Sequence, residues 1–433
     1  MSKLMWGIGS LAVLSAAVVG GNLYADKSLA QFYTQNNWSA AVQDVDVKYS
    51  NYQMGLMGGT VDWVLTLKTD PCKPKEVIVL KGTDQIQRGL KGYNINSNFK
   101  IVQQQSTSEY AKLFGTVLTA KTLVNWIGQS KTDLQIPAFK TTAQGATVQA
   151  DASQLQIRIS SLPGQATKVS ELSIHLPVVL LSEGPMQTMV QNFSMKTNQG
   201  LNQKNLENGF VEIQAGSIKR LDQKFSGGMR GMQLRWETEL NKHDVDFEGY
   251  LKADEMDFPG SPVTKDFALN LALHKVNLDK VRAFSELLHQ VENSCDAVGE
   301  SSEEMTQAFL AIASQGFDFE SKDNSISIGG GKASANVVGK VMPGHHASME
   351  SFIKMVPSLL DFQADLSFDK NMMTAIMNNF LQLQGKSLSG QEAEAMFAGF
   401  ETSGQGKRDG NNMVMSMQYK FGQKLFGQAI QKK

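Results

Sequence analysis

Hydrophobic and polar residues alternate through much of the chain, beginning close to residue 45. Val61, Trp63, Leu65 and Leu67 are separated by single residues, most of them polar. A period of two places successive side chains on opposite faces of a β-strand, so it predicts strands with one buried face. The same period predicts further strands around residues 45–49, 93–99, 155–159, 172–176, 211–213, 232–236, 245–247, 267–273, 317–319, 326–328, 362–368 and 413–421.

Helical spacing replaces this alternation in several segments of the C-terminal half. Apolar residues recur every three or four positions between Leu278 and Val291, which predicts an amphipathic helix. Ser301 and Ser389 are each followed three residues later by a glutamate, the spacing of a capping box at a helix N-terminus. Further helices are expected after Ser348, after Asp369 and at residues 110–127.

The order of these elements predicts an α+β protein with one N-terminal transmembrane helix. Long stretches of alternation are typical of large, mostly antiparallel sheets that bury one face. Short amphipathic helices are expected to cover that face. We expect an N-terminal anchor at residues 1–27, a strand-rich region at 28–275, and a mixed helix and strand region at 276–433 packed on the same sheet system.

The segment from Leu4 to Tyr24 is apolar and contains no charged residue. As a helix rising about 1.5 Å per residue it spans roughly 31 Å, close to the hydrocarbon thickness of a bilayer. Lys3 precedes it, and positive charge is retained on the cytoplasmic side of a membrane. We therefore expect a signal-anchor with the rest of the chain outside the cytoplasm. A cleaved signal peptide is the alternative, although Leu23 is large for a cleavage site.

The charge of the chain is nearly balanced. Its 41 lysines and arginines and 42 aspartates and glutamates give a net charge of −1. Nucleic-acid binding requires a basic face that neutralises phosphates, so this composition argues against a nucleic-acid partner.

Cys72 and Cys295 are the only cysteines in the sequence. An oxidising compartment would permit a disulfide between them. Both lie in polar surroundings, so two unpaired surface thiols are the alternative. Pairing depends on the distance between the two residues, which the sequence does not give, and both alternatives stay open.

Methionines are concentrated near the C-terminus, where ten of the 21 follow residue 340. Methionine is flexible and adapts to ligands of different shape, so a row of methionines can line an apolar groove. Ordinary core packing and a subunit interface are the alternatives. The residues concerned are Met372, Met373, Met377, Met413, Met415 and Met417.

Candidate chemistry is sparse. A calcium-loop spacing is matched in part by Asp244, Asp246, Glu248 and Glu255, but Lys252 occupies a position where an oxygen ligand is expected. Carboxylates on the solvent side of a strand explain this segment better, because it also alternates. The sequence contains no His-x-x-x-His or Cys-x-x-Cys pair and no Gly-x-Ser-x-Gly motif. We expect no metal, no cofactor and no catalytic residue.

Five short motifs lie at residues 20–24, 47–53 with Gly55, 269–285, 362–380 and 415–419. In these motifs the chain resembles the YdgA-like family of Gram-negative envelope proteins. The resemblance covers both ends and the last third of the chain, whereas residues 105–260 match only in general character. It implies a single-pass inner-membrane protein with a periplasmic body that self-associates, and it assigns no catalytic or binding residue. Cys72 and Cys295 are not part of the family pattern.

Together these features predict a non-enzymatic, membrane-tethered periplasmic protein. It would act in cell-envelope organisation or in handling an apolar ligand such as lipid. The alternative is a homo-oligomeric, for example homodimeric, scaffold that engages other envelope proteins through its methionine-rich C-terminal third. An envelope enzyme remains a further alternative, because a site assembled only in three dimensions leaves little trace in a sequence.

Overall fold

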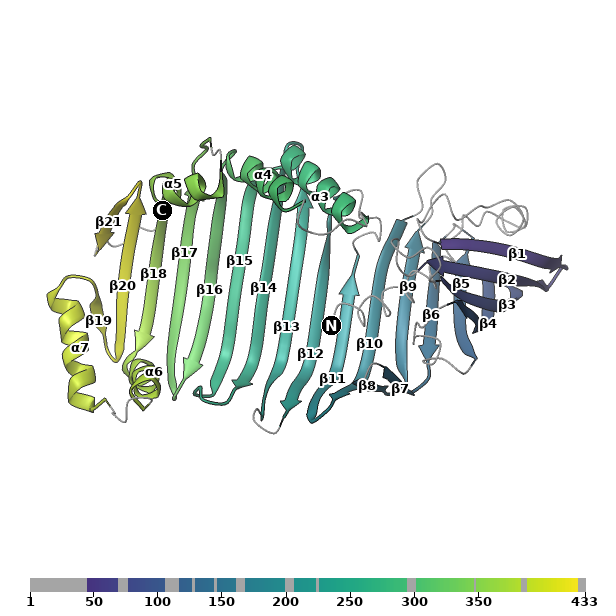
Figure 1. Cartoon of the computed structure of the whole chain (residues 1–433), viewed down its shortest axis with the longest axis horizontal. Helices are drawn as coiled ribbons and strands as arrows, with labels where there is room; N and C mark the ends of the chain where they lie inside the picture. The colour runs from purple at the N-terminus through teal and green to yellow at the C-terminus, as the bar shows by residue number, and fades with distance from the viewer. Residues whose placement is uncertain are drawn as a thin grey trace. The chain divides into compact units, whose positions relative to one another are not determined.

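A computed structural model of the chain forms two compact units (Figure 1). Unit 1 contains strands β1 to β11, and unit 2 contains strands β12 to β21 with helices α3 to α7. The division between the two units lies between β11 and β12, and residue 275 lies inside β15 of unit 2. The structure describes residues 45–68, 77–105, 117–126, 129–143, 146–160, 168–198, 206–222, 226–293, 301–345, 348–382 and 388–426.

Unit 1 is an antiparallel sheet. Strands β1 to β5 each pair with the next strand along the chain. β6 then pairs with β9, β9 with β10, and β10 with β11, while β8 shares the β9 edge of β10 and also pairs with β7. The strands are β1 (Val45–Met54), β2 (Gly58–Lys68), β3 (Val77–Gly89), β4 (Gly92–Gln105), β5 (Leu118–Asn125), β6 (Gln129–Ile136), β7 (Phe139–Ala143), β8 (Ala146–Ala150), β9 (Ser153–Ser160), β10 (Lys168–Glu183) and β11 (Met186–Thr197).

The prediction of a helix at residues 110–127 is wrong where the structure describes this segment, because Leu118–Asn125 forms strand β5. Leu118, Ala120 and Val124 are buried and alternate with exposed residues. This is a period of two, which the threonine and leucine content of the segment obscured. Residues 110–116 lie outside the described residues.

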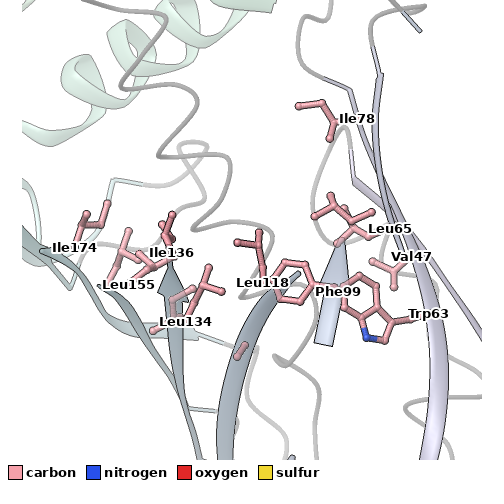
Figure 2. Packing of buried hydrophobic residues seen from close by; sticks show 14 of the residues in the cluster. Val47, Trp63, Leu65, Ile78, Phe99, Leu118, Leu134, Ile136, Leu155 and Ile174 are labelled. Atoms are coloured by element: carbon pink, nitrogen blue, oxygen red, sulfur yellow. The ribbon is translucent and has the colours of Figure 1, made fainter. Parts of the chain in front are cut away.

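One face of unit 1 carries its main hydrophobic core, to which eight strands contribute. Figure 2 shows ten labelled members of this core, from Val47 on β1 to Ile174 on β10. Trp63 is its largest fully buried side chain, and its indole ring lies 5.5 Å from the ring of Phe99. A Cβ at residue 82 would lie 2.3 Å from Cζ2 of Trp63, so Gly82 makes room for the indole.

A line of buried polar residues crosses this face. The line contains Asp84 on β3, Ser97 on β4, Thr122 on β5 and Thr132 on β6, all at most 1% exposed. Asp84 and Ser97 are register partners, and the hydroxyls of Thr122 and Thr132 are 3.0 Å apart. The Trp63 indole N–H donates a hydrogen bond of 2.8 Å to Oδ1 of Asp84. Val61 and Ile95, the register partners of Asp84 and Thr122, belong to a smaller buried cluster together with Ile86, Tyr93 and Val124.

Unit 2 is also an antiparallel sheet. Strands β12 to β17 each pair with the next strand along the chain. β20 pairs with β18 on one edge, and with β19 and β21 on the other. The strands are β12 (Gly209–Leu221), β13 (Ser226–Leu240), β14 (Asp244–Asp257), β15 (Thr264–Asn277), β16 (Phe317–Ile328), β17 (Gly331–Val341), β18 (Leu360–Asp369), β19 (Lys407–Asp409), β20 (Asn412–Lys420) and β21 (Gln423–Phe426).

The helices of unit 2 are short and connect its later strands. Ser348 and Ser389 form the capping boxes of α5 and α7, and Oδ1 of Asp369 accepts a hydrogen bond of 2.8 Å from the backbone N–H of Met372 in α6. The helices expected after Ser348, Asp369 and Ser389 are therefore confirmed. The helices are α3 (Leu278–Asn293), α4 (Ser301–Ala313), α5 (Met349–Leu359), α6 (Lys370–Gln382) and α7 (Gly390–Thr402).

These helices pack near the ends of the strands, as Figure 1 shows. Leu278 and Val281 of α3 join a buried cluster with Val245 and Val276 at one end of β14 and β15. Toward the other end of β18, the Phe368 ring contacts Phe397 and Phe400 of α7, at centroid distances of 5.8 and 6.1 Å. The helices thus bury the strand ends of unit 2. The fold is α+β, with antiparallel sheets and short helices as the alternation predicts.

Two bulges interrupt the ladder between β15 and β16. Asp266 and Asp323 have φ angles of 48° and 55°, which are uncommon in strands because side chains disfavour positive φ. Asn324 replaces lost ladder contacts: its Oδ1 accepts a bond of 2.7 Å from the Asn270 backbone, and its Nδ2 donates one of 2.9 Å to the Ala335 carbonyl. Side-chain amides therefore hold this irregular part of the sheet, which locally bends strands.

No helix within the described ranges is long and apolar enough to cross a membrane. The expected anchor, Leu4 to Tyr24, lies outside those ranges.

Candidate functional site

The candidate site is an exposed apolar surface in the middle of the unit 2 sheet. Register pairing places Leu234 of β13 beside Leu251 of β14, and Leu251 beside Leu269 of β15. The neighbouring row on the same face consists of Trp236, Gly249 and Leu271. We call the side chains of these two rows the apolar strip. It consists of Leu234, Trp236, Leu251, Leu269 and Leu271.

Four of the five side chains of the strip are exposed to solvent. The exposed fractions are 38% for Leu234, 37% for Trp236, 45% for Leu269 and 42% for Leu271. Single exposed apolar residues are common, but a contiguous group is typical of a binding surface. Register pairing shows that these residues are contiguous, so the strip is a candidate binding surface.

The indole of Trp236 lies against the backbone of the neighbouring strand. A Cβ at residue 249 would lie 2.5 Å from Cε3 of Trp236, so the ring occupies the space that a side chain would need. The Trp236 ring also stacks on Phe247, with a centroid distance of 5.8 Å and an interplanar angle of 29°. Gly249 and Phe247 thus hold the indole as a flat apolar platform on the sheet.

A row of aromatic residues continues from this platform across unit 2. Phe247 pairs with Leu273, Leu273 with Phe319, Phe319 with Gly339, Gly339 with Phe362, and Phe362 with Tyr419. The rings of Phe362 and Tyr419 stack with a centroid distance of 5.2 Å. A Cβ at residue 339 would lie 2.7 Å from Cζ of Phe319, so this glycine also makes room for a ring. The members of this row are half-buried. They extend the apolar face beyond the strip.

The opposite face of the sheet is more polar and carries several ion pairs. Nη2 of Arg235 lies 2.9 Å from Oε2 of Glu237, and Nη1 lies 3.4 Å from Oε2 of Glu212. The hydrogen bond to Glu237 raises the pKa of Arg235 above its ordinary value. Lys322 lies 2.7 Å from Glu320 on the same face. Ion pairs of this kind suit a solvated surface, so the apolar face is the one available to an apolar ligand.

The four carboxylates with calcium-loop spacing lie along strand β14 and are not brought together. Asp244 pairs with Asn277 near one end of the strand, whereas Glu255 pairs with Lys265 toward the other. Oε2 of Glu255 lies 2.6 Å from Nη2 of Arg230, and Oδ1 of Asp246 accepts a bond of 2.8 Å from the Lys275 backbone. Glu248 is exposed and opposes Glu237. The described residues contain no group of three or more potential metal ligands.

The methionines of the expected groove occupy different surroundings. Met372 on α6 is 7% exposed and Met413 on β20 is fully buried, so both are core residues. Met415 and Met417 are half-buried and pair with Leu366 and Ala364 of β18. Met373 and Met377 are half-buried on α6. The methionines of β20 therefore border the aromatic row at Tyr419.

Cys72 and Cys295 lie outside the residues that the structure describes. The sequence pattern indicated strands at residues 232–236 and 267–273, yet it did not identify the apolar strip. Alternation shows that one face of a strand is apolar, but it does not show whether another element covers that face. Gly249 is a glycine inside the alternating segment that forms β14. A glycine at an apolar position of a strand is a local sign that a large side chain lies close to the backbone.

No curated protein and no solved structure matches the chain. A family model, described as a bacterial protein of unknown function, matches residues 1–430. The chain therefore belongs to the bacterial DUF945 family.

Proposed function

We propose that this protein is a non-enzymatic, membrane-tethered periplasmic protein that binds an apolar chain, such as a lipid acyl chain, on the apolar strip of unit 2. The observation that carries the proposal is the exposure of Trp236 and Leu271, which are register neighbours across Gly249. The tether is the segment from Leu4 to Tyr24, and the location is the inner membrane. Both rest on the sequence and on its resemblance to the YdgA-like family.

The size of the strip suits one acyl chain. The strip lies on β13, β14 and β15 and therefore spans two inter-strand spacings, or about 10 Å at about 4.8 Å each. The hydrocarbon of one bilayer leaflet is about 15 Å thick, half of the usual core. An acyl chain lying across these strands would therefore cover the strip from end to end.

Burial of an acyl chain on the strip would also supply enough free energy for binding. Removing one methylene from water contributes about 0.8 kcal/mol, so ten methylenes contribute on the order of 8 kcal/mol before the costs of association. Only part of that gain remains after ordering and partial exposure of the chain, which corresponds to weak and reversible binding. Weak binding suits a protein that handles lipid rather than storing it.

The first experiment is native mass spectrometry of the full-length protein extracted in detergent, with lipid identification on the same sample. We expect lipid at a fixed ratio to protein. In the variant Leu271→Glu, a charge in the centre of the strip would have to be desolvated beneath the acyl chain, so the bound lipid should fall at least tenfold.

Val338→Glu is the matched control. Val338 is 42% exposed, as Leu271 is, but it opposes Glu320 and Gln363 on the polar face. This variant should keep its lipid. Equal loss of lipid from both variants, or a lipid-free wild-type protein, would contradict the proposal.

A homo-oligomeric scaffold is the second candidate function, and the same exposed face favours it, because a second copy could cover an apolar face. The two candidates differ in the mass spectrum. A lipid-free dimer that Leu271→Glu converts to monomer would support the scaffold, whereas a lipid-loaded species whose oligomeric state is unchanged by Leu271→Glu would support lipid binding.

A further inference from the structure

Three hairpin tips meet at one end of the unit 1 sheet. The β1–β2 tip contains Leu56 and Met57, the β3–β4 tip contains Leu90, and β5 is followed by Trp126. Strands β1 to β6 pair consecutively and antiparallel, so every second connection lies at the same end of the sheet. These three tips are therefore neighbours.

The large apolar side chains at these tips are unusually exposed. Leu56 is 88% exposed, Met57 79%, Leu90 101% and Trp126 37%. Glycine, asparagine and serine are the usual residues of hairpin turns, because they adopt turn conformations and are well solvated. Large apolar residues neither favour turn conformations nor are well solvated. Their presence at three adjacent tips therefore indicates a surface that contacts an apolar environment.

Specific contacts connect the tips to one another. The Arg88 backbone N–H donates a bond of 2.9 Å to the Met57 carbonyl, which joins the first tip to the second. The Trp126 indole N–H donates a bond of 2.9 Å to the Leu90 carbonyl, which joins the third to the second. The Trp126 ring also contacts Tyr93 at a centroid distance of 5.2 Å. The tips therefore form one built surface, the hairpin-tip patch, consisting of Leu56, Met57, Leu90 and Trp126.

Two positively charged side chains, Arg88 and Lys91, lie beside this patch. The guanidinium of Arg88 lies 5.6 Å from the centre of the Trp126 ring, and Lys91 is exposed beside Leu90. Residues 51–60, 86–94 and 124–131 contain no aspartate or glutamate. These three stretches therefore carry only positive charge, although the whole chain has a net charge of −1.

From these observations we propose that the hairpin-tip patch inserts into the interfacial region of a lipid bilayer that contains anionic lipid. Leucine and methionine would enter the acyl boundary, tryptophan would lie at headgroup depth, and Arg88 and Lys91 would contact phosphates. The proposal rests on unit 1 alone and is independent of the apolar strip in unit 2.

The charge pattern favours a bilayer over a protein partner. A protein interface of ordinary size has a polar rim in which both signs of charge occur, and it buries about 800 Å² per partner. The patch instead consists of a few protruding side chains with cations beside them. This arrangement matches the chemistry of an anionic membrane surface, in which headgroup phosphates lie directly above an apolar layer.

The test uses the full-length chain reconstituted in vesicles of phosphatidylcholine with phosphatidylglycerol. A photo-crosslinker is introduced as Leu90→p-benzoylphenylalanine, and covalent lipid adducts are measured by mass spectrometry. Glu183→p-benzoylphenylalanine is the matched control, because Glu183 is exposed in the β10–β11 turn at the opposite strand end of the same sheet. We expect lipid adducts at position 90 and at most background at position 183.

Charge supplies a second readout. Each cation near an anionic surface contributes about a fivefold change in binding, so Lys91→Gln should lower the adduct yield at position 90 by up to about fivefold. Leu271→Glu should leave that yield unchanged, which separates this proposal from the lipid-binding strip. Adducts to a protein chain instead of lipid, or equal yields at positions 90 and 183, would overturn the proposal.

Discussion

The indole of Trp236 occupies the space above Gly249 on the neighbouring strand, where a Cβ would lie 2.5 Å from its Cε3 atom. Gly249→Ala should therefore displace the indole from its position on Phe247. Because the new methyl group overpacks this site, we expect the free energy of unfolding to fall by about 1–3 kcal/mol. Chemical denaturation of the full-length protein measures this change, and a shift in tryptophan fluorescence should accompany it.

The control for this prediction is Gly399→Ala in α7, where a Cβ would meet no atom within 4 Å. Alanine favours a helix over glycine by roughly 0.5–1 kcal/mol, so this variant should be slightly more stable than the wild type. If both substitutions changed stability in the same direction, the contact between Trp236 and Gly249 would not be the cause.

The hydrogen bond from Trp63 to Asp84 predicts a coupled loss of stability in unit 1. Trp63→Phe removes the indole N–H that donates to a fully buried carboxylate oxygen and also leaves a space beside Gly82. We expect the free energy of unfolding to fall by about 2–4 kcal/mol. A double-mutant cycle with Asp84→Asn should show coupling of at least about 0.5 kcal/mol, and strictly additive effects would contradict this account.

We predict that α7 packs less stably on the rest of unit 2 at acidic pH, because Glu394 of α7 pairs with Lys370 of α6 and Arg408 of β19. Hydrogen bonds from Arg408 and from Lys370, whose Nζ lies 3.3 Å from Oε2, lower the pKa of Glu394 below its ordinary value of 4.5. A lowered pKa in the folded state means that the ionised form stabilises the fold above pH 4.5. That contribution disappears as the pH falls through the lower pKa of the folded state.

Hydrogen exchange of α7 at neutral pH and below pH 4.5 measures this loss. In Glu394→Gln, exchange in α7 should depend less on pH than in the wild type, because the titrating group is gone. An unchanged acid dependence in the variant would assign the effect to other carboxylates.

We predict that removing the Asn324 side-chain amide at the bulge between β15 and β16 lowers the free energy of unfolding. Its side chain accepts from the Asn270 backbone and donates to the Ala335 carbonyl. Asn324→Ala leaves both backbone groups without this partner, so we expect a loss of about 1–3 kcal/mol in the free energy of unfolding. Ser325→Ala, which removes one exposed hydrogen bond, should cost at most about 0.5 kcal/mol. Similar costs for the two variants would show that the bulge does not depend on Asn324.

Local signals in the sequence predicted many elements correctly. Ser348, Ser389 and Asp369 were expected to begin helices, and each caps one, because capping depends on residues only three positions apart. The strands around Trp63 and Leu234 were also expected, since alternation is local. Other strands were missed, such as β3, where the buried polar residue Asp84 interrupts the apolar alternation.

The sequence by itself determined the strand-rich α+β class and the starts of α5, α6 and α7, because periodicity and helix caps depend on residues close together in the chain. Only the tertiary structure decided which apolar faces stay exposed. Leu271 and Leu65 belong to equally regular alternating segments, yet Leu271 is 42% exposed and Leu65 is fully buried. The difference depends on which elements far apart in sequence cover each face, and the pattern of a single strand carries no information about its cover.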